Sequence, residues 1–320
     1  MPRTVLVVGE LRDGAPSAST LDLLGGAFGL AGGAQVAVTL LGRGASGAAA
    51  ACAGATRAFA SDDPEYDTFR ADQWLPAIGV ALDACDPDVV LIAQSSAGRD
   101  LGPRLAHRRG TAVAMDCVRI TDDAGALRAT RPAYGGNAEA TYTFATRPAM
   151  ATIRARSFAA MESGIRPKTA EPLPAAGPSR VRSVGRDRPE AGGLRLEDAR
   201  VVISGGRGLG GAEGFALLEG LAGAIGAERA AVAASRAAVD LGWAAPDRQV
   251  GLTGKVVTPD LYVAVAISGA SQHLAGCSGA RVLVAVNRDE AAPIFDVARY
   301  GIVGDYREVI PAIEAAIRTG

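Results

Sequence analysis

The sequence has few of the side chains from which metal sites and hydrolytic centres are built. Among 320 residues there are two histidines and four cysteines. The cysteines, Cys52, Cys85, Cys117 and Cys277, have no C-x-x-C spacing, so we expect buried, reduced thiols and no metal site. The histidines, His107 and His273, have no serine or cysteine nucleophile in a triad order, which disfavours hydrolytic catalysis.

An excess of charge of one sign is also missing. The chain has 33 basic and 34 acidic residues, a net charge of −1, so it offers no overall field for nucleic acid or anionic lipid. No uncharged apolar run is long enough to span a bilayer, so we expect no membrane insertion. Residues 1–8 enter a strand pattern at once, which leaves no room for a signal peptide and predicts a cytoplasmic location.

What the chain does have is a repeated alternation of strand and helix patterns, which predicts an α/β protein with two domains. In the N-terminal half, helix-period segments at 67–85 and 101–109 separate β-branched runs, as in a parallel-sheet αβα domain. Those runs are 5–8, 36–41, 89–93 and 112–115. Residues 121–158 carry short strand and turn signals instead, and we interpret them as a β-rich extension of the same domain.

Five prolines between residues 163 and 195 predict an extended linker or covering strand. The alternation then resumes, with strands near 201–204, 230–233, 261–266 and 282–286 and helices at 214–225 and 309–318. We therefore predict an N-terminal α/β domain over 1–162, a linker over 163–195 and a second doubly wound domain over 196–320. The N-terminal domain is expected to serve as the platform for a partner.

Polar residues follow the strands of the second domain where each strand ends. Gly206 to Gly211 fits G-x-G-x-x-G between a strand and a helix, where backbone N–H groups can hold a diphosphate, although a plain tight turn is the alternative. The acidic residue that ends the next strand in NAD-binding proteins is missing, since Ser235 and Arg236 follow instead. Ser235 fits either a ligand or a helix N-cap.

Two further loops carry candidate ligand groups. Thr253 and Lys255 lie in a glycine-flanked loop that lacks the first half of a phosphate loop, so nucleotide hydrolysis is unsupported. Ser268 to His273 follow an apolar strand, and a lone histidine there is more often structural than a proton-transfer group. Asn287 and Asp305 also follow strands, and we expect all these strand ends to form the rim of one crevice.

These segments resemble the electron transfer flavoprotein alpha subunit, in the order and spacing of that family. The matching segments of the C-terminal half are 204–209, 234–240, 251–255, 268–276, 292–295 and 300–303, and those of the N-terminal half are 98–105 and 130–137. The resemblance covers nearly the whole chain. It implies a heterodimer with a beta subunit, one FAD held mainly by the C-terminal domain, and no substrate turnover by this chain alone.

The resemblance also implies a path for electrons and a set of cofactor contacts. Electrons would come from flavoprotein dehydrogenases and pass to a quinone oxidoreductase or another redox acceptor. Arg207 and Ser235 would serve the diphosphate and ribityl side, Arg236 and Thr253 the flavin ring, and His273 its pyrimidine carbonyl. The FAD-binding residues implied are Arg207, Ser235, Arg236, Val250, Gly251, Leu252, Thr253, Ser268, Gly269, Ala270, Ser271, Gln272, His273, Asn287, Asp305 and Tyr306. Positive charge on Arg236 and His273 would stabilise a reduced, more anionic flavin.

The sequence departs from the family's usual pattern at several of these positions. Leu252 replaces a customary glutamine, Ala266 a customary glycine and Tyr306 a frequent leucine. An alpha-like paralogue with a specialised redox partner or degenerate flavin binding is therefore the nearest alternative. A nicotinamide-dependent dehydrogenase and a purely structural subunit are more distant ones.

Overall fold

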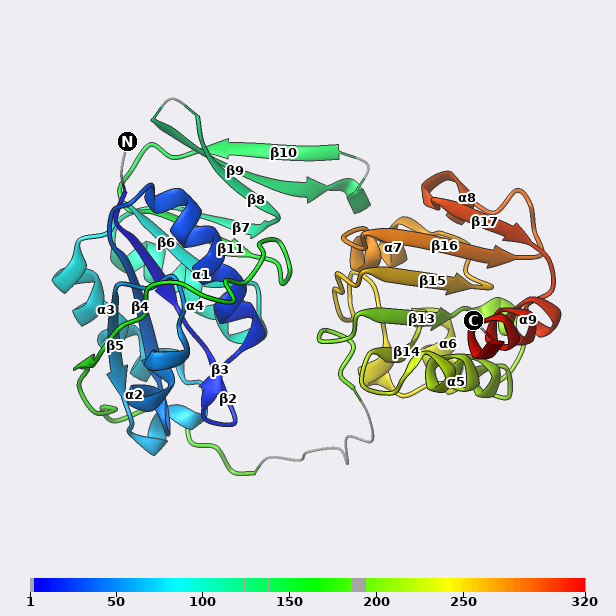
Figure 1. Ribbon diagram of the computed structural model, residues 1–320, viewed down its shortest axis with the longest axis horizontal. Coiled ribbons are helices and arrows are strands. Elements are labelled where there is room, and N and C mark those ends of the chain that lie inside the picture. Colours follow the sequence, from blue (N-terminus) through cyan, green and yellow to red (C-terminus); the bar gives the residue numbers. More distant parts are fainter. Residues whose placement is uncertain (1–2, 124, 137, 186–193, 320) are drawn as a thin grey trace. The chain divides into compact units, whose positions relative to one another are not determined.

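The computed structural model describes residues 3–123, 125–136, 138–185 and 194–319. The chain divides into two compact units (Figure 1). The N-terminal unit contains Met1–Pro132 and Glu139–Arg186, and the C-terminal unit contains Ala133–Ala138 and Asp187–Gly320. The domain boundaries predicted near residues 162 and 195 remain predictions.

A seven-stranded sheet forms the centre of the N-terminal unit, with the order β12-β5-β4-β1-β6-β11-β7. Every neighbouring pair in this sheet is parallel. Its strands are β1 (Val5–Val8), β4 (Val36–Leu41), β5 (Arg57–Ser61), β6 (Val89–Ala93), β7 (Val113–Cys117), β11 (Ala149–Ile153) and β12 (Ala170–Pro172). The predicted parallel-sheet αβα domain is confirmed.

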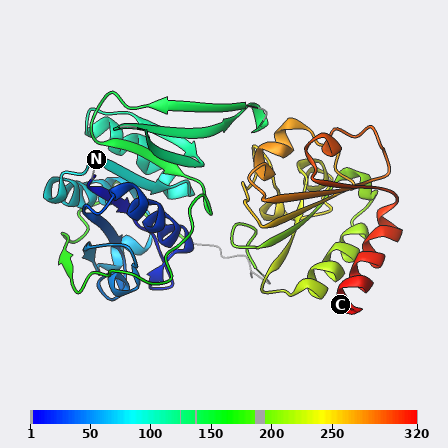
Figure 2. The ribbon, with the colours of Figure 1, turned by 45° about the horizontal axis from the view of Figure 1, so that its top comes forward.

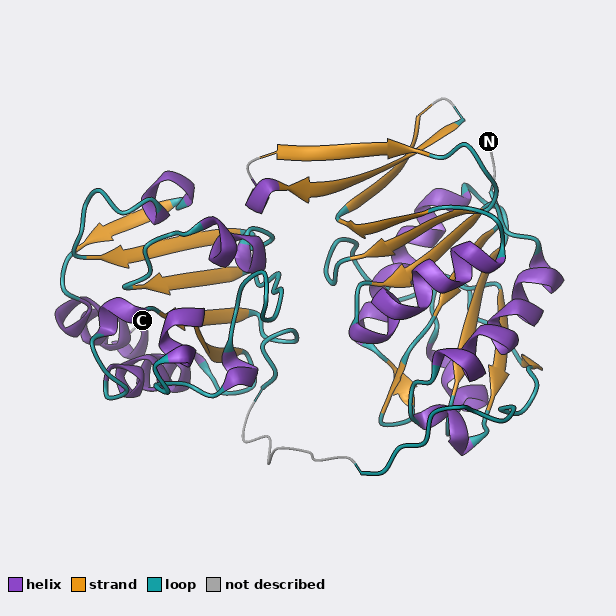
Figure 3. Ribbon diagram, turned by 180° about the vertical axis from the view of Figure 1, so that it is seen from behind, coloured by secondary structure: helices purple, strands orange, loops and turns teal. Residues whose placement is uncertain are grey.

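Helices cover both faces of this sheet, which explains why its central strands β1 and β6 are apolar throughout rather than alternating (Figure 3). Val5 and Val7 pack in one core with α1 (Ala18–Ala31), and Leu6 and Val8 pack in the other with α3 (Ala71–Cys85). The second core also holds residues of α4 (Ser96–Arg108). The shorter elements of this unit are α2 (Ala45–Ala48), β2 (Leu11–Arg12), β3 (Ala15–Pro16) and the 3-10 helices Ala49–Ala51 and Pro64–Asp67.

The predicted β-rich extension is a separate three-stranded sheet with the order β10-β9-β8. Its strands are β8 (Arg119–Asp123), β9 (Ala126–Ala133) and β10 (Ala138–Thr143), and β8 pairs antiparallel with β9. A 3-10 helix, Tyr134–Gly136, lies between β9 and β10.

Part of the predicted linker is a strap bound to the N-terminal unit, which we define as residues 170–181. Its first residues form β12, which pairs parallel with β5 at the edge of the sheet. The next residue, Leu173, is buried, and its N–H donates to the carbonyl oxygen of Ala60 at 2.7 Å. The covering strand was therefore the better of the two predictions for this part of the segment.

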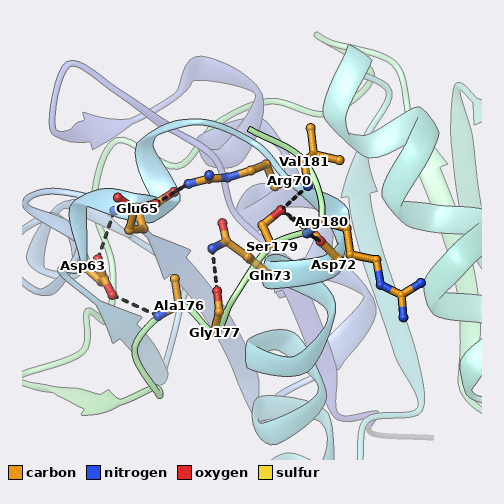
Figure 4. Close-up of polar contacts among 10 residues, drawn as sticks. All are labelled: Asp63, Glu65, Arg70, Asp72, Gln73, Ala176, Gly177, Ser179, Arg180 and Val181. Carbon is orange, nitrogen blue, oxygen red and sulfur yellow. Dashed lines mark hydrogen bonds and ion pairs between the residues drawn. The ribbon is translucent and has the colours of Figure 1, made fainter. Parts of the chain in front are cut away.

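Side chains of the N-terminal unit hold the rest of the strap by its main chain (Figure 4). The Asp63 carboxylate accepts from the N–H of Ala176 at 2.9 Å, and the Gln73 amide donates to the carbonyl oxygen of Gly177 at 2.6 Å. The N–H of Glu65 donates to the other oxygen of Asp63, and these two backbone donors lower the pKa of that carboxyl.

The Asp72 carboxylate, in the first turn of α3, binds the end of the strap. It accepts from the N–H of Arg180 at 2.8 Å and from the Ser179 hydroxyl at 2.9 and 3.0 Å (Figure 4). The Ser179 oxygen in turn accepts from the N–H of Val181. Chiefly because of the Arg180 donor, the pKa of Asp72 is lowered.

Removing the Asp72 carboxylate should release the end of the strap. In the variant Asp72→Ala we expect trypsin to cleave after Arg180 about fivefold to tenfold faster, because local opening exposes that peptide bond. Rates of limited proteolysis, followed by mass spectrometry, give the measurement. Asp83→Ala removes an exposed carboxylate from the same helix and is the control, and equal rates in the two variants would contradict the assigned role.

A five-stranded parallel sheet of order β14-β13-β15-β16-β17 forms the C-terminal unit. Its strands are β13 (Val201–Gly205), β14 (Ala230–Ala234), β15 (Leu261–Val265), β16 (Val282–Asn287) and β17 (Tyr300–Val303). Its helices are α5 (Gly214–Ile225), α6 (Arg236–Asp240), α7 (Ser271–Cys277), α8 (Ile294–Val297) and α9 (Tyr306–Thr319), with 3-10 helices at Arg207–Leu209 and Pro246–Arg248. The helices α5 and α9 lie side by side (Figure 2).

The strand order of this sheet creates a crevice. From β13 the chain runs first to β14 on one side and then to β15 on the other side. The loops that leave β13 and β15 therefore diverge at their carboxyl ends, and in open parallel sheets ligands bind at such switch points. The predicted doubly wound C-terminal domain is confirmed.

Candidate functional site

A cavity of about 870 Å³ opens at this switch point. Residues at the ends of four different strands line it, namely 206–208 after β13, 235–237 after β14, 266–268 and 270 after β15, and 287–289 at the end of β16. Four of the predicted strand ends therefore share one rim, whereas Asp305, after β17, lines a smaller cavity instead. The volume lies in the range of small-molecule and cofactor sites. Among the described residues, no group of three or more His, Cys, Asp or Glu side chains is placed to hold a metal ion.

The glycine-rich loop is shaped by the close approach of two backbones. A Cβ on Gly206 would lie 2.1 Å from the carbonyl oxygen of Ala266, and one on Gly208 would lie 2.9 Å from the same atom. Prediction and structure differ in one respect, because the motif does not lead directly into a helix. A 3-10 turn, Arg207–Leu209, follows the strand, and α5 begins only at Gly214. The exposed Arg207 lines the cavity.

Opposite this loop, Ala266 has the left-handed φ of +53°. That conformation costs a residue with a Cβ about 1 kcal/mol or more, whereas glycine adopts it freely.

Replacing Ala266 with glycine should therefore stabilise the C-terminal unit. We expect Ala266→Gly to raise its free energy of unfolding by about 0.5–1 kcal/mol, since relief of strain outweighs the greater chain entropy of glycine. Urea denaturation measures the change. The control is Ala264→Gly, two residues earlier in β15 and fully buried, which should destabilise the unit. Loss of stability in both variants would show that Ala266 is not strained.

After β14, Ser235 has the structural role that was one of its two predictions. Its hydroxyl caps α6 by accepting from the N–H of Ala238 at 3.4 Å, a long bond. Arg236 is exposed and pairs with Asp240 one turn along at 3.3 Å. Both Ser235 and Arg236 line the cavity.

The loop of residues 250–253 forms another wall of the cavity. Gly251 has φ +147°, and a Cβ there would lie 2.9 Å from the carbonyl oxygen of Gln272. The N–H of Leu252 donates to that same oxygen at 2.7 Å, while its side chain is 68% exposed. The Thr253 hydroxyl accepts from the Gln249 amide at 3.0 Å.

The segment of residues 268–273 turns sharply from β15 into α7. Gly269 has φ +92°, and a Cβ there would lie 2.3 Å from the backbone nitrogen of Ile294. Ser268, Ala270 and Gln272 line the cavity, but Gly269 and Ser271 do not. Ser271 is the first residue of α7.

His273 is a buried histidine in the cavity wall. Its Nε2 is 2.9 Å from the hydroxyl of the fully buried Tyr262, and its Nδ1 has no well-formed hydrogen bond within the described chain. Burial lowers the pKa of His273 to about 4, against a smaller raising effect of the Val250 backbone. The side chain is therefore neutral at pH 7, which differs from the expectation that it supplies positive charge.

Asn287, Asp305 and Tyr306 lie toward the β17 edge of the sheet. Asn287 lines the large cavity and also a smaller one, which Asp305 and Tyr306 line as well. Tyr306 is buried, and its hydroxyl donates to the carbonyl oxygen of Leu209 at 2.7 Å, so it supports the glycine-rich loop from behind.

The structure thus brings most of the predicted residues to one cavity. The residues that line it are Arg207, Ser235, Arg236, Val250, Gly251, Leu252, Thr253, Ser268, Ala270, Gln272, His273 and Asn287. Sequence reasoning missed Asp240, Gln249, Arg288 and Asp289, which also line it. Arg288 and Asp289 could have been predicted, because they directly follow Asn287 at a strand end that the sequence analysis had identified.

Comparison with known proteins gives matches along most of the chain. Residues 5–181 match the family described as electron transfer flavoprotein domain, and residues 195–278 match the electron transfer flavoprotein FAD-binding domain. The chain is 36% identical to the electron transfer flavoprotein subunit alpha of Bacillus subtilis (strain 168), over 98% of this chain and 97% of that protein. It is 43% identical to the Paracoccus denitrificans subunit alpha, over 86% and 89%. Protein FixB of Bradyrhizobium diazoefficiens is 38% identical over 83% and 73%.

Proposed function

Because the chain belongs to the electron transfer flavoprotein alpha-subunit family, we propose that the cavity at the β13–β15 switch point is its FAD site. As a member of that family the protein carries electrons on FAD, and alpha subunits of this family pair with a beta subunit. The single observation that carries the proposal is the position of the cavity, which the glycine-rich loop and four strand ends enclose.

The residues around the cavity suit a dinucleotide. Arg207 lines it and makes no ion pair with any described residue, so its guanidinium is available for a phosphate. Gly206 and Gly208 keep the loop close to Ala266, and the buried Nδ1 of His273 lacks a well-formed partner. When bound, FAD supplies one-electron and two-electron redox chemistry.

The roles we propose for these residues are binding and positioning. Arg207 and Ser235 hold the diphosphate and ribityl side, Arg236 lies against the flavin ring, and Thr253 donates to the ring edge. His273 contributes a neutral imidazole N–H to the pyrimidine side. Residues 268–272 line the phosphate and ribityl chain, and Val250 to Leu252 close one wall against water.

The adenosine side is assigned to Asn287, Asp305 and Tyr306. The first two follow β16 and β17, and Tyr306 fixes the loop beneath them. We further propose that the chain turns over no substrate of its own. The two carboxylates that line the cavity are engaged, Asp240 by Arg236 and Asp289 by the N–H of Ala291.

The partners are proposed at the level of the family. A flavoprotein dehydrogenase would donate electrons, and a quinone oxidoreductase or another redox protein would accept them. The structure contains no helix, within its described residues, with the length and apolarity required to cross a membrane. The cytoplasmic location remains a prediction.

Purification of the tagged chain from its host with any bound partner tests the proposal. We expect about one FAD per complex, seen in the visible absorption spectrum, together with a beta-like chain. A colourless complex would favour the paralogue with degenerate flavin binding. Reduction of the bound flavin by NADH without a second flavoprotein would favour a dehydrogenase.

Leu252 should affect the redox potential of the bound flavin. Its side chain is exposed at the cavity, so Leu252→Gln introduces an amide donor there without disturbing the backbone contact to Gln272. We expect the flavin potential to rise by the equivalent of about 1 kcal/mol, because a donor stabilises the more anionic reduced form. Spectroelectrochemistry measures the potential, and Leu252→Met is the apolar control. A potential equal to that of wild type would exclude a tuning role for Leu252.

A further inference from the structure

Arg288 lies where two cavities meet. It lines both the large cavity at the switch point and the smaller one at the end of β17. Only a few residues line both, among them Gly208 of the glycine-rich loop and Asn287. Arg288 is thus placed between the loop suited to a diphosphate and the strand ends assigned to adenosine.

The guanidinium of Arg288 has no carboxylate partner within the described part of the chain. Two other arginines that line these cavities do, since Arg236 pairs with Asp240 at 3.3 Å and Arg307 pairs with Asp305 at 3.5 Å. The neighbouring carboxylate of Asp289 is engaged by the N–H of Ala291 at 3.0 Å. An exposed, unpaired cation therefore remains at the edge of the site.

Hydrogen bonds fix the backbone on both sides of Arg288. The Asn287 amide donates to the carbonyl oxygen of Ile267 at 3.0 Å, which ties the end of β16 to the loop after β15. The Asn287 side-chain oxygen accepts from the N–H of Asp289, also at 3.0 Å. Arg288 therefore extends from a fixed turn, and less order is lost when its side chain binds a ligand.

We propose that Arg288 is a further cofactor-binding residue, which pairs with the adenosine-side phosphate of the dinucleotide. A guanidinium suits this task because its planar N–H groups match phosphate oxygens in a bidentate pair. Arg207, within the glycine-rich loop, would serve the flavin-side phosphate. This inference rests on the proposed FAD site and adds a second positive charge at its diphosphate.

The test uses the alpha–beta heterodimer after removal of its flavin, with the dissociation constant for FAD measured by flavin fluorescence quenching. We expect Arg288→Gln to weaken FAD binding about 10- to 100-fold, as loss of a charge-assisted pair does. The matched control is Arg281→Gln. Arg281 is also exposed, but it lies next to the opposite end of β16 and lines neither cavity.

Two further measurements separate a phosphate contact from a general effect. The FAD affinity of Arg288→Gln should depend less steeply on salt concentration than that of wild type, and Arg288→Lys should recover part of the lost affinity. An FAD affinity of Arg288→Gln within twofold of Arg281→Gln would overturn the inference while leaving the FAD site intact. A wild-type heterodimer that takes up no FAD would instead overturn the proposed site itself.

Discussion

Between pH 7 and pH 4 the free energy of unfolding of the C-terminal unit should fall by about 3 kcal/mol through His273 alone. The cause is burial, which lowers the pKa of His273 from 6.5 to about 4 in the folded protein. The unfolded chain therefore binds a proton in this interval that the folded chain does not. Stability rises with pH wherever the unfolded state binds more protons. The free energy of unfolding is therefore unaffected by His273 above about pH 6.5, and it decreases as the pH falls toward 4.

The two tryptophans allow this unit to be followed separately. Trp243 packs against the core of the C-terminal unit, whereas Trp74 lies in a core of the N-terminal unit. In a Trp74→Phe background, urea denaturation monitored by the fluorescence of Trp243 therefore reports on the C-terminal unit. The lowered pKa values of Asp63 and Asp72 belong to the other unit, and the stability they contribute is lost only below their ordinary value of 3.8.

The control is His273→Gln, which removes the titrating group but retains a polar side chain. We expect the dependence of stability on pH between 4 and 6.5 to flatten in this variant. If wild type and variant lose stability equally in that interval, the imidazole is not held neutral by burial. His273 could then supply positive charge to the reduced flavin, as the sequence analysis expected.

Gly206→Ala should destabilise the C-terminal unit by about 3 kcal/mol and abolish FAD uptake. The new methyl group would lie 2.1 Å from the carbonyl oxygen of Ala266. The obstacle is backbone rather than a flexible side chain, so the glycine-rich loop and the loop after β15 must separate. Both line the cavity, and its shape must change with them.

Gly223→Ala is the matched control for this variant. It makes the same substitution in α5 of the same unit, where an added Cβ meets nothing within 4 Å. Alanine is the better helix former, so a gain of about 0.5–1 kcal/mol is expected. Denaturation gives the two stabilities and fluorescence quenching gives the FAD affinity. A Gly206→Ala protein that binds FAD normally would show that the close approach to Ala266 is dispensable.

Most strands of both sheets were predictable because their local pattern and their burial agree. In the seven-stranded sheet, however, β5 was not predicted, and β11 was wrongly assigned to the β-rich extension. Both faces of β1 are covered, so Val5 to Val8 form a continuous apolar run that nothing else explains as well. The helix α1 was missed because Gly25, Gly26 and Gly29 dilute its pattern. Two of these glycines permit close packing, since a Cβ on Gly25 would meet Ala159 and one on Gly26 would meet Phe158. Such long-range contacts are invisible to local periodicity.

The site was predictable as far as strand ends reveal it. Ser235, Ser268 and Asn287 each follow an apolar strand, and parallel strands bring their ends to one edge. The protonation state of His273 could not be predicted, because it depends on burial and, to a smaller extent, on the backbone of Val250 in another loop. For the strap, the sequence predicted a covering strand as one of two possibilities but not where it binds. Its binding depends on Asp63 and Asp72, more than 100 residues earlier.

Where two segments of the chain approach most closely in the wall of the cavity, the contact is between main-chain atoms. Side chains at Gly206, Gly208 and Gly251 would each collide with the backbone of another segment. A side chain at any of these positions therefore requires a shift of the backbone. Natural or engineered adjustment of cofactor affinity and potential must therefore act through the few side chains that stand free at the cavity, and Leu252 and Arg288 are two of them. A library built to retune this carrier should vary those positions and leave the glycines unchanged.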